Sequence, residues 1–240
     1  MVCALIVAGG SGRRFGGATP KQYLPLAGVP VLVRTLEVFD RCEGVDTLVL
    51  VVPPGDEPLV RDSLLAAAGI RKTVRLCSGG AQRQDSVFNG LACIPDDDAI
   101  VVIHDAVRPL VTCECIIACV DGARAYGACI AAVPAWDTLK RVTPAGRIDA
   151  TLPREGVWLA QTPQAFRAGL IRQAHQAALS QNFPGTDDAS LVERCGGSVR
   201  VVSGSRRNIK ITTPEDMALA EALLAARPLP PGHGRRPLCG

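Results

Sequence analysis

Basic side chains follow a glycine-rich turn near the start of the chain. An apolar run leads into segment 9–12, Gly-Gly-Ser-Gly, and Arg13, Arg14 and Lys21 come soon after it. Backbone N–H groups of such a turn can approach phosphate oxygens, because glycine has no Cβ in the way. An arginine can bind two oxygens at once, and a lysine adds a point charge. The pattern predicts a polyphosphate site.

The turn matches neither of the two best-known phosphate-binding motifs. The dinucleotide fingerprint G-x-G-x-x-G requires glycine where Phe15 stands, and the P-loop G-x-x-x-x-G-K-[ST] requires lysine where Ala18 stands. A surface turn with solvated cations is the alternative interpretation. The position of the turn after the first predicted strand favours a ligand site, because ligands bind at the carboxyl ends of strands in open α/β sheets.

Two further segments place polar side chains at the end of a predicted strand. Asp105 and Arg108 follow the apolar run 99–103. The carboxylate could hold Mg²⁺ and the arginine could bind a second anion, although an Asp–Arg pair at a sheet edge can equally be a structural ion pair. Segment 78–90 contains a second Gly-Gly turn, which suits either a nucleotide base or a capped helix start.

Short apolar runs alternate with segments long enough to be crossover helices. Runs rich in valine and isoleucine are typical of strands buried on both faces, and their alternation with helices implies a parallel sheet. The sequence therefore predicts an α/β, Rossmann-like fold, with a mostly parallel sheet and helices on both faces. The predicted strands are 3–8, 47–52, 73–76, 99–103, 129–133 and 198–202. The predicted helices are 31–39, 58–68, 83–93 and 113–126.

The segment from about 134 to 163 interrupts this alternation, because it contains no helix of crossover length. It consists of two extended runs around the turn sequence Thr-Pro-Ala-Gly-Arg at 143–147. We expect a β-arm that projects from the sheet, and because an isolated hairpin is marginally stable, we expect it to pack on a second copy of the chain. The prediction is one domain over residues 1–226 and a disordered, Pro/Gly-rich tail over 227–240.

Composition argues against several functional classes. The chain has 240 residues and a net charge of +3, with 48% hydrophobic, 20% charged and 4% aromatic residues. This is an ordinary globular composition, without the basic, aromatic-rich stripe of a nucleic-acid-binding protein. The ten cysteines form no C-x-x-C pair, so we expect reduced thiols in the cytoplasm and no structural metal. No apolar run approaches the ~18 residues of a membrane span, and we expect no membrane partner.

Several motifs together resemble one enzyme family. The opening segment resembles the nucleotide-sugar pyrophosphorylase-like nucleotidyltransferases, and PKQYL at 20–24 resembles the cytidylyltransferases that act on small polyol phosphates. Later motifs follow in the order typical of the methylerythritol phosphate cytidylyltransferases, so that the resemblance covers residues 3 to about 226. These motifs are HDAVRP at 104–109, DTLKR at 137–141, QTPQAF at 161–166, TDDASLVE at 186–193 and NIKITTPEDMALAEALL at 208–224.

The resemblance implies a reaction and a set of site residues. The chain would transfer the cytidylyl group of CTP to 2-C-methyl-D-erythritol 4-phosphate in non-mevalonate isoprenoid synthesis, with release of pyrophosphate. Mg²⁺ bound at Asp105 would be the cofactor, and the arms of a homodimer would complete the acceptor sites. The catalytic residues would be Arg14, Lys21 and Lys210. The nucleotide-binding residues would be Ala8, Gly9, Gly10, Gly12, Gly80, Ser86 and Asp105, and the acceptor-binding residues Asp105, Arg108, Thr138, Arg154, Thr162 and Thr186.

Two alternative functions remain open. The acceptor could be a pentitol phosphate such as ribitol 5-phosphate, because related cytidylyltransferases share PKQ, HDAVRP and QTPQ, although TDDASLVE favours methylerythritol phosphate. The chain could also be a non-catalytic, nucleotide-binding regulator that has kept the fold. Such relatives typically lose the lysine or the metal-binding acid, and here Lys21 and Asp105 are both present.

Overall fold

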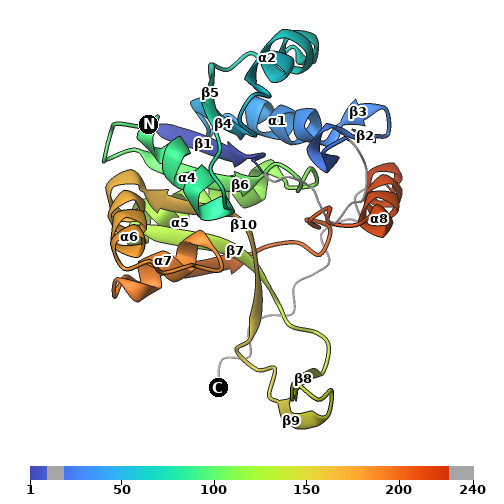
Figure 1. Ribbon diagram of the computed structural model, residues 1–240, viewed down its shortest axis with the longest axis vertical. Helices are drawn as coiled ribbons and strands as arrows, with labels where there is room; N and C mark the ends of the chain where they lie inside the picture. Colours follow the sequence, from blue (N-terminus) through green and yellow to red (C-terminus); the bar gives the residue numbers. More distant parts are fainter. Residues whose placement is uncertain (10–18, 227–240) are drawn as a thin grey trace.

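A seven-stranded sheet forms the centre of the computed structural model, which describes residues 1–9 and 19–226 (Figure 1). β10 is antiparallel to both of its neighbours, and every other pair of adjacent strands is parallel. The predicted mostly parallel sheet is therefore confirmed. In the order in which they pair, the strands are β11 (Arg200–Ser203), β7 (Ala128–Pro134), β10 (Trp158–Arg167), β6 (Ile100–Asp105), β1 (Val2–Val7), β4 (Thr47–Val52) and β5 (Val74–Ser78).

Helices cover both faces of the sheet, as the sequence predicts. Along β1, Ala4 and Ile6 belong to one hydrophobic core, while Leu5 and Val7 belong to the other. Every residue of β1 is buried, which explains why its sequence shows no polar alternation. The first core includes α1 (Val31–Arg41) and α5 (Cys113–Tyr126), and the second includes α4 (Arg83–Ala92), α6 (Ala168–Ser180) and α7 (Asp188–Arg194).

The central strand β10 is absent from the sequence prediction. Pro163 lies within it, and proline is unfavourable in a central strand because it cannot donate a ladder hydrogen bond. The strand accommodates the proline with a register shift against β7 between Ala160 and Gln164. Within this irregular stretch, the Thr162 hydroxyl accepts a hydrogen bond from the backbone N of Asp105, at 3.1 Å. The irregular stretch of β10 therefore supplies a side chain that binds the backbone at the carboxyl end of β6.

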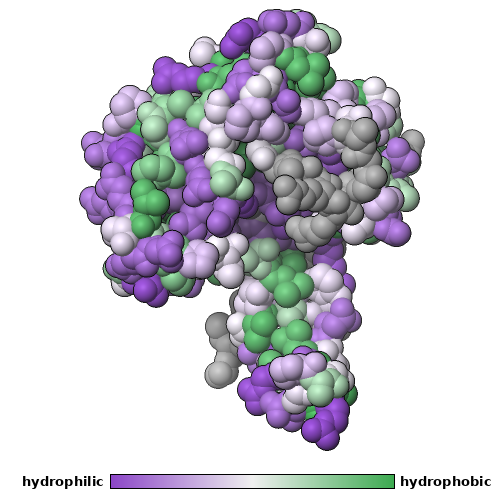
Figure 2. All heavy atoms as spheres, in the orientation of Figure 1, coloured by the Kyte–Doolittle hydropathy of each residue, from purple (hydrophilic) through white to green (hydrophobic). Residues whose placement is uncertain are grey.

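The predicted arm projects from the sheet (Figure 1). β7 and β10 continue beyond the body to the pair Pro134–Trp158, and β8 (Leu139–Val142) and β9 (Ile148–Leu152) form a separate antiparallel pair at the tip. Residues 161–163, which the prediction assigns to the arm, are buried. Apolar side chains are exposed along the arm (Figure 2). They are Trp136, Val142, Ile148, Leu152, Val157, Trp158 and Leu159.

Smaller elements complete the described part of the chain. α8 (Pro214–Ala225) begins with Pro214 in its first turn, and the Thr213 side chain accepts a hydrogen bond from Asp216 N. The predicted helix 58–68 is built of α2 (Glu57–Leu59), the π-helical η3 (Val60–Leu65) and α3 (Ala66–Ala68). Beside α1 lie η2 (Lys21–Tyr23), β2 (Pro25–Leu26) and β3 (Val29–Pro30). Among the described residues, no helix is long and apolar enough to cross a membrane.

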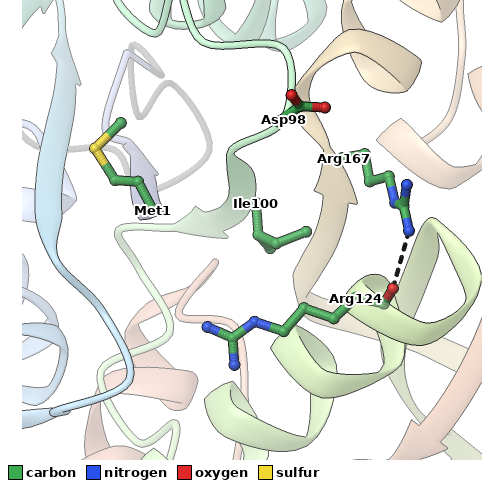
Figure 3. A pocket seen from close by; sticks show the side chains of 5 residues that line it. All are labelled: Met1, Asp98, Ile100, Arg124 and Arg167. Atoms are coloured by element: carbon green, nitrogen blue, oxygen red, sulfur yellow. Dashed lines mark hydrogen bonds between the residues drawn. The ribbon is translucent and has the colours of Figure 1, made fainter.

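A cavity of about 310 Å³ opens where β1 and β6 begin (Figure 3). It is lined by Met1, Asp98, Ile100, Arg124 and Arg167, and Arg167 Nη2 donates to the backbone O of Arg124 at 3.1 Å. Because the residues predicted to do chemistry follow the opposite ends of these strands, this cavity lies at the other edge of the sheet. None of the predicted site residues lines it.

Candidate active site

Asp105, the last residue of β6, is buried and surrounded by three cations. Arg83 Nε lies 2.9 Å from Asp105 Oδ1, and Lys210 Nζ lies 2.8 Å from Oδ2, with Arg108 Nε 3.8 Å from the same oxygen. Burial alone would raise the pKa of Asp105, but the charges of Arg83 and Lys210 outweigh it and hold the pKa far below its usual value. Counting Asp188, which also pairs with Arg83, three cations face two carboxylates, so the cluster keeps a net positive charge that can attract anions.

Lys210 is positioned by the segment around Asn208. Asn208 is buried, and its Nδ2 donates to the backbone O of Thr162 at 2.8 Å. Arg108 Nη1 donates to the backbone O of Asn208 at 2.7 Å, and Ile211 N donates at 2.9 Å to the backbone just after β6. These bonds fix segment 208–211 against the loop that follows β6 and against Thr162, which lies within the antiparallel strand β10. They bring the predicted catalytic residue Lys210 to Asp105.

Gly9, just after β1, lies against Gly79 in the second glycine-rich turn. A Cβ on Gly79 would lie 3.4 Å from Gly9 Cα, and a Cβ on either glycine would lie 2.9 Å from Ser86 Oγ. A Cβ at Gly9 or Gly79 would therefore require the Ser86 side chain to move. Ser86 Oγ donates to Gln82 O and accepts from Gly80 N, both at 3.0 Å. Ser86 therefore shapes the second turn, and its contact with a nucleotide base stays a prediction.

Lys21 begins η2, which is anchored beside the end of β1. Gln22 Nε2 donates to the backbone O of Ala8 at 2.9 Å, and Ala8 N donates to the neighbouring strand at Val51 O. Lys21 therefore emerges at the same sheet edge as Ala8 and Gly9. The predicted residues Gly10, Gly12 and Arg14 lie outside the described residues, so their roles stay predictions.

Thr162 and Thr186 approach the cluster from two other elements. Thr162 is buried, and its hydroxyl accepts the hydrogen bond from Asp105 N described above. Thr186 is exposed in the turn before α7. The preceding Gly185 N donates to Gln84 Oε1 on α4 at 2.9 Å, which holds this turn near the first residues of α4. Both threonines stay predictions as ligands of the acceptor.

The structure does not bring Thr138 and Arg154 to this cluster. Both are exposed on the arm, where they flank the β8–β9 pair. Arg154 Nη1 donates to the backbone O of Trp136 at 2.6 Å, and the Arg206 guanidinium lies 4.3 Å from the Trp136 ring centroid. The root of the arm is thus attached to the segment that leads to Lys210. Within one chain, however, the two predicted acceptor ligands lie on the arm.

Arg83 and Asp188 also belong to this cluster, although neither was predicted from the sequence as a site residue. Arg83 Nη1 lies 2.9 Å from Asp188 Oδ2, so the guanidinium joins two buried carboxylates. Burial would lower the pKa of Arg83, but Asp188 and Asp105 outweigh this effect and raise it. One signal was available in the sequence: Arg83 is the first residue of a helix, where the helix dipole disfavours a cation. An arginine at that position therefore needs a partner elsewhere.

His104 precedes Asp105 but does not offer a general base. It is completely buried, and burial lowers its pKa to about 4. Its Nε2 lies 3.1 Å from the backbone O of Arg108. The neutral ring thus supports the loop after β6. The described side chains at this end of the sheet are therefore suited to binding anions and neutralising their charge, and not to general acid–base catalysis.

Asp105 does not by itself make a site for a divalent cation. Both of its oxygens bind cationic side chains, and the described residues contain no group of three or more His, Cys, Asp or Glu side chains that could hold a metal ion. Mg²⁺ is commonly bound by one or two carboxylates together with the phosphates of a substrate. The residues present fit such an ion only if a nucleotide supplies most of its ligands.

Comparison with known proteins identifies the family. The model of the IspD family, 2-C-methyl-D-erythritol 4-phosphate cytidylyltransferase, matches residues 2–226. A relative with that name from Syntrophus aciditrophicus is 51% identical over 223 residues, which are 93% of this chain and 95% of the relative. Another from Geobacillus kaustophilus is 46% identical over 224 residues, which are 93% of this chain and 97% of the relative.

Solved structures give the same result. A 4-diphosphocytidyl-2C-methyl-D-erythritol synthase from Anaerococcus prevotii has a TM-score of 0.83 and 33% identity, covering 94% of this chain and 96% of that one. The 2-C-methyl-D-erythritol 4-phosphate cytidylyltransferase from Thermus thermophilus has a TM-score of 0.77 and 30% identity, covering 94% and 100%. Of the two acceptors left open by the motifs, these matches favour methylerythritol phosphate. The chain therefore belongs to the 2-C-methyl-D-erythritol 4-phosphate cytidylyltransferase family.

Proposed function

We propose that the chain joins a phosphate oxygen of 2-C-methyl-D-erythritol 4-phosphate to the α-phosphorus of CTP, with Lys21 and Lys210 beside the reacting phosphates. Membership of the family assigns the overall cytidylyl transfer, as its name describes. The attacking oxygen forms a bond to the α-phosphorus. The bond between the α-phosphorus and the oxygen that bridges it to the β-phosphorus breaks, and pyrophosphate leaves with that electron pair. Arg14 would add a third cation. The observation that carries the proposal is the ion pair between Lys210 and Asp105, at the same end of the sheet as Gly9 and the second glycine-rich turn.

The reaction needs no general base. A phosphate monoester is already anionic at neutral pH, so its oxygen can attack without losing a proton. This fits the cluster at Asp105, where cations dominate and the nearby His104 is buried and neutral. The contribution of the protein is to place two anions together and to stabilise the charge that develops between them.

We propose Mg²⁺ as the cofactor, carried mainly on the phosphate oxygens of CTP. When bound, it would neutralise charge on the leaving pyrophosphate. The engagement of both Asp105 oxygens supports an ion that enters with the nucleotide rather than one held by the chain alone. Removal of Mg²⁺ with EDTA should abolish pyrophosphate release but leave the melting temperature of the free protein unchanged. A large fall in that temperature would indicate a metal held by the protein itself.

We further propose a homodimer in which the arm of one chain reaches the acceptor site of the other. Two observations support it: the arm exposes seven large apolar side chains, and Arg154 and Thr138 lie on it rather than at the cluster. Burying those apolar side chains against a second copy would be favourable. The partner's arm would then supply the acceptor ligands that the cluster lacks.

We also propose that the enzyme works in the cytoplasm. Each of the nine cysteines in the described part of the chain is a free thiol. Free thiols are typical of proteins in a reducing compartment, which supports this location.

A coupled assay of pyrophosphate release tests the proposed reaction. We expect turnover with CTP and 2-C-methyl-D-erythritol 4-phosphate, much slower turnover with ribitol 5-phosphate, and loss of activity when UTP replaces CTP. Faster turnover of ribitol 5-phosphate would contradict the proposed acceptor. Binding of CTP in calorimetry without turnover of either acceptor would instead indicate a nucleotide-binding regulator.

A further inference from the structure

We infer that Arg83 and Asp188 form a positioning pair that keeps Asp105 paired and in place while Lys210 turns towards a phosphate. This inference rests on the proposed function, in which Lys210 contacts a reacting phosphate. Neither residue of the pair has a role in the mechanism above. Neither was predicted from the sequence as a site residue, because the two are far apart in the chain and meet only in the folded structure.

The geometry of Arg83 is determined from two sides. Its Nε lies 2.9 Å from Asp105 Oδ1 and its Nη1 lies 2.9 Å from Asp188 Oδ2. A guanidinium is planar and presents its donors in a rigid fork, so two carboxylates on different nitrogens fix its orientation. The Asp188 side chain is only 2% exposed. Asp188 is therefore too deeply buried to bind a substrate and can act on the reaction only through its neighbours.

Lys210 and Arg83 occupy different oxygens of Asp105. Lys210 Nζ lies 2.8 Å from Oδ2, and its side chain is 38% exposed, so it can also reach a ligand. If Lys210 were the only partner, its movement to a phosphate would leave a buried carboxylate uncompensated, which is strongly unfavourable. Arg108 Nε, at 3.8 Å from Oδ2, is too distant for a hydrogen bond. Arg83 keeps the carboxylate paired and so allows Lys210 to be shared with the substrate.

The far side of the pair is anchored in the protein core. His175 Nε2 lies 3.2 Å from Asp188 Oδ1, and both side chains are almost completely buried. The His175 ring stacks against Phe88 on α4, with 6.3 Å between ring centroids. Asp188 is therefore held by α6 and its own helix α7 as well as by Arg83. A line of polar contacts runs from Asp105 through Arg83 and Asp188 to His175.

A double-mutant cycle in the full-length protein tests the inference. We expect Asp188→Asn to lower kcat about 10-fold and Arg83→Met to lower it about 100-fold, because small misplacements of catalytic groups have effects of this size. The KM for CTP should stay within about threefold in both, since a positioning residue affects the transition state rather than substrate binding. In the Arg83→Met background, Asp188→Asn should cause no further loss. Arg83→Lys should recover part of kcat, and Arg75→Met, which removes an exposed arginine, should leave kcat unchanged.

Three results would overturn the inference. They are a raised KM for CTP with unchanged kcat in Arg83→Met, a full additional loss when Asp188→Asn is added to Arg83→Met, and unchanged kcat in Asp188→Asn alone. If thermal melting shows that Arg83→Met does not fold, the kcat and KM values of Asp188→Asn and Arg83→Lys are used for the test instead. Failure of the wild type to release pyrophosphate would contradict the proposed function instead, so the two failures are distinguishable.

Discussion

At the carboxyl edge of the sheet, Lys210 lies 2.8 Å from a buried carboxylate, whereas Arg154 on the arm is exposed and donates to a backbone carbonyl. Both are cations predicted to bind phosphates. At the edge, hydrogen bonds from Asn208, Arg108 and Ile211 fix the segment that carries the lysine. On the arm, the neighbouring large apolar side chains face solvent. The edge is thus built by contacts within one chain, and the arm is suited to contacts with another.

Charge acts differently in the two regions because burial differs. The Asp105 side chain is 9% exposed, so its interactions with Arg83 and Lys210 operate in a low-dielectric environment. On the arm, Arg141 Nε lies 2.6 Å from Asp149 Oδ2, but these side chains are 64% and 46% exposed. Water and salt weaken such a pair. A short distance alone therefore does not indicate an important ion pair.

The largest expected effect comes from removing the cation at the edge. Lys210→Ala should lower kcat about 10³-fold, because a positioned cation contributes about that much in phosphoryl transfer. Pyrophosphate release at saturating CTP measures it. Arg41→Ala is the matched control, since Arg41 is an exposed cation paired with Glu37 on α1, and it should leave turnover unchanged. If Lys210→Ala kept a turnover within a few-fold of the wild type, the cation at the end of the sheet would contribute little to catalysis, and the proposed role of Lys210 would be wrong.

The next effect tests whether the arm acts on a second copy. Arg154→Ala should raise the KM for the acceptor about 10- to 100-fold, because a hydrogen bond to a charged group contributes about 1.5–3 kcal/mol. Arg147→Ala, in the exposed turn of the arm, should leave this KM unchanged and is the control. An unchanged KM in Arg154→Ala would contradict the proposed role of Arg154.

Mixing two defective variants, assayed at an acceptor concentration well below the raised KM of Arg154→Ala, gives a stricter test. If the arm of one chain completes the site of the other, unfolding and refolding Lys210→Ala and Arg154→Ala together in equal amounts should restore about a quarter of the sites. In a mixed dimer, one site then has both its own Lys210 and the partner's intact arm. Recovery of no activity, with mixed dimers present by native mass spectrometry, would show that each site uses the arm of its own chain.

A smaller effect is expected from the bonds that hold the edge together. Asn208→Ala should lower the free energy of unfolding by about 1–3 kcal/mol, because it leaves the buried backbone O of Thr162 without that donor. Urea denaturation measures the loss. Asn89→Ala is the matched control, since its Nδ2 donates to Ser78 O in an exposed position, and it should cost less. Equal losses for the two variants would mean that burial does not distinguish the edge from the surface.

The smallest effect is expected on the arm itself. Asp149→Asn breaks the exposed pair with Arg141 and should change the free energy of unfolding by less than about 1 kcal/mol. The same urea measurement, at low and at moderate salt, checks this value. A larger loss would show that the pair is buried in the assembled protein, which would itself support contact between arms.

Particular elements show how far the sequence could be interpreted. The valine-rich strands β4 and β6 were predicted because burial on both faces produces continuous apolar runs. β10 was missed because its first residues belong to the exposed arm, its last residues are buried, and Pro163 lies between them. No single periodicity describes such a strand. β10 pairs with β6 and β7, and this pairing depends on packing between segments that are far apart in the sequence.

Motif order and apolar patterning are local properties of the chain, so they were enough to predict the family, the α/β class and the residue types of the site. The folded structure was needed to show that Arg83 and Asp188 join Asp105 and Lys210, and that Thr138 and Arg154 do not. The ion pairs depend on which helix starts become neighbours of the end of β6. That arrangement follows from the packing of the whole sheet and its helices, which no short segment encodes.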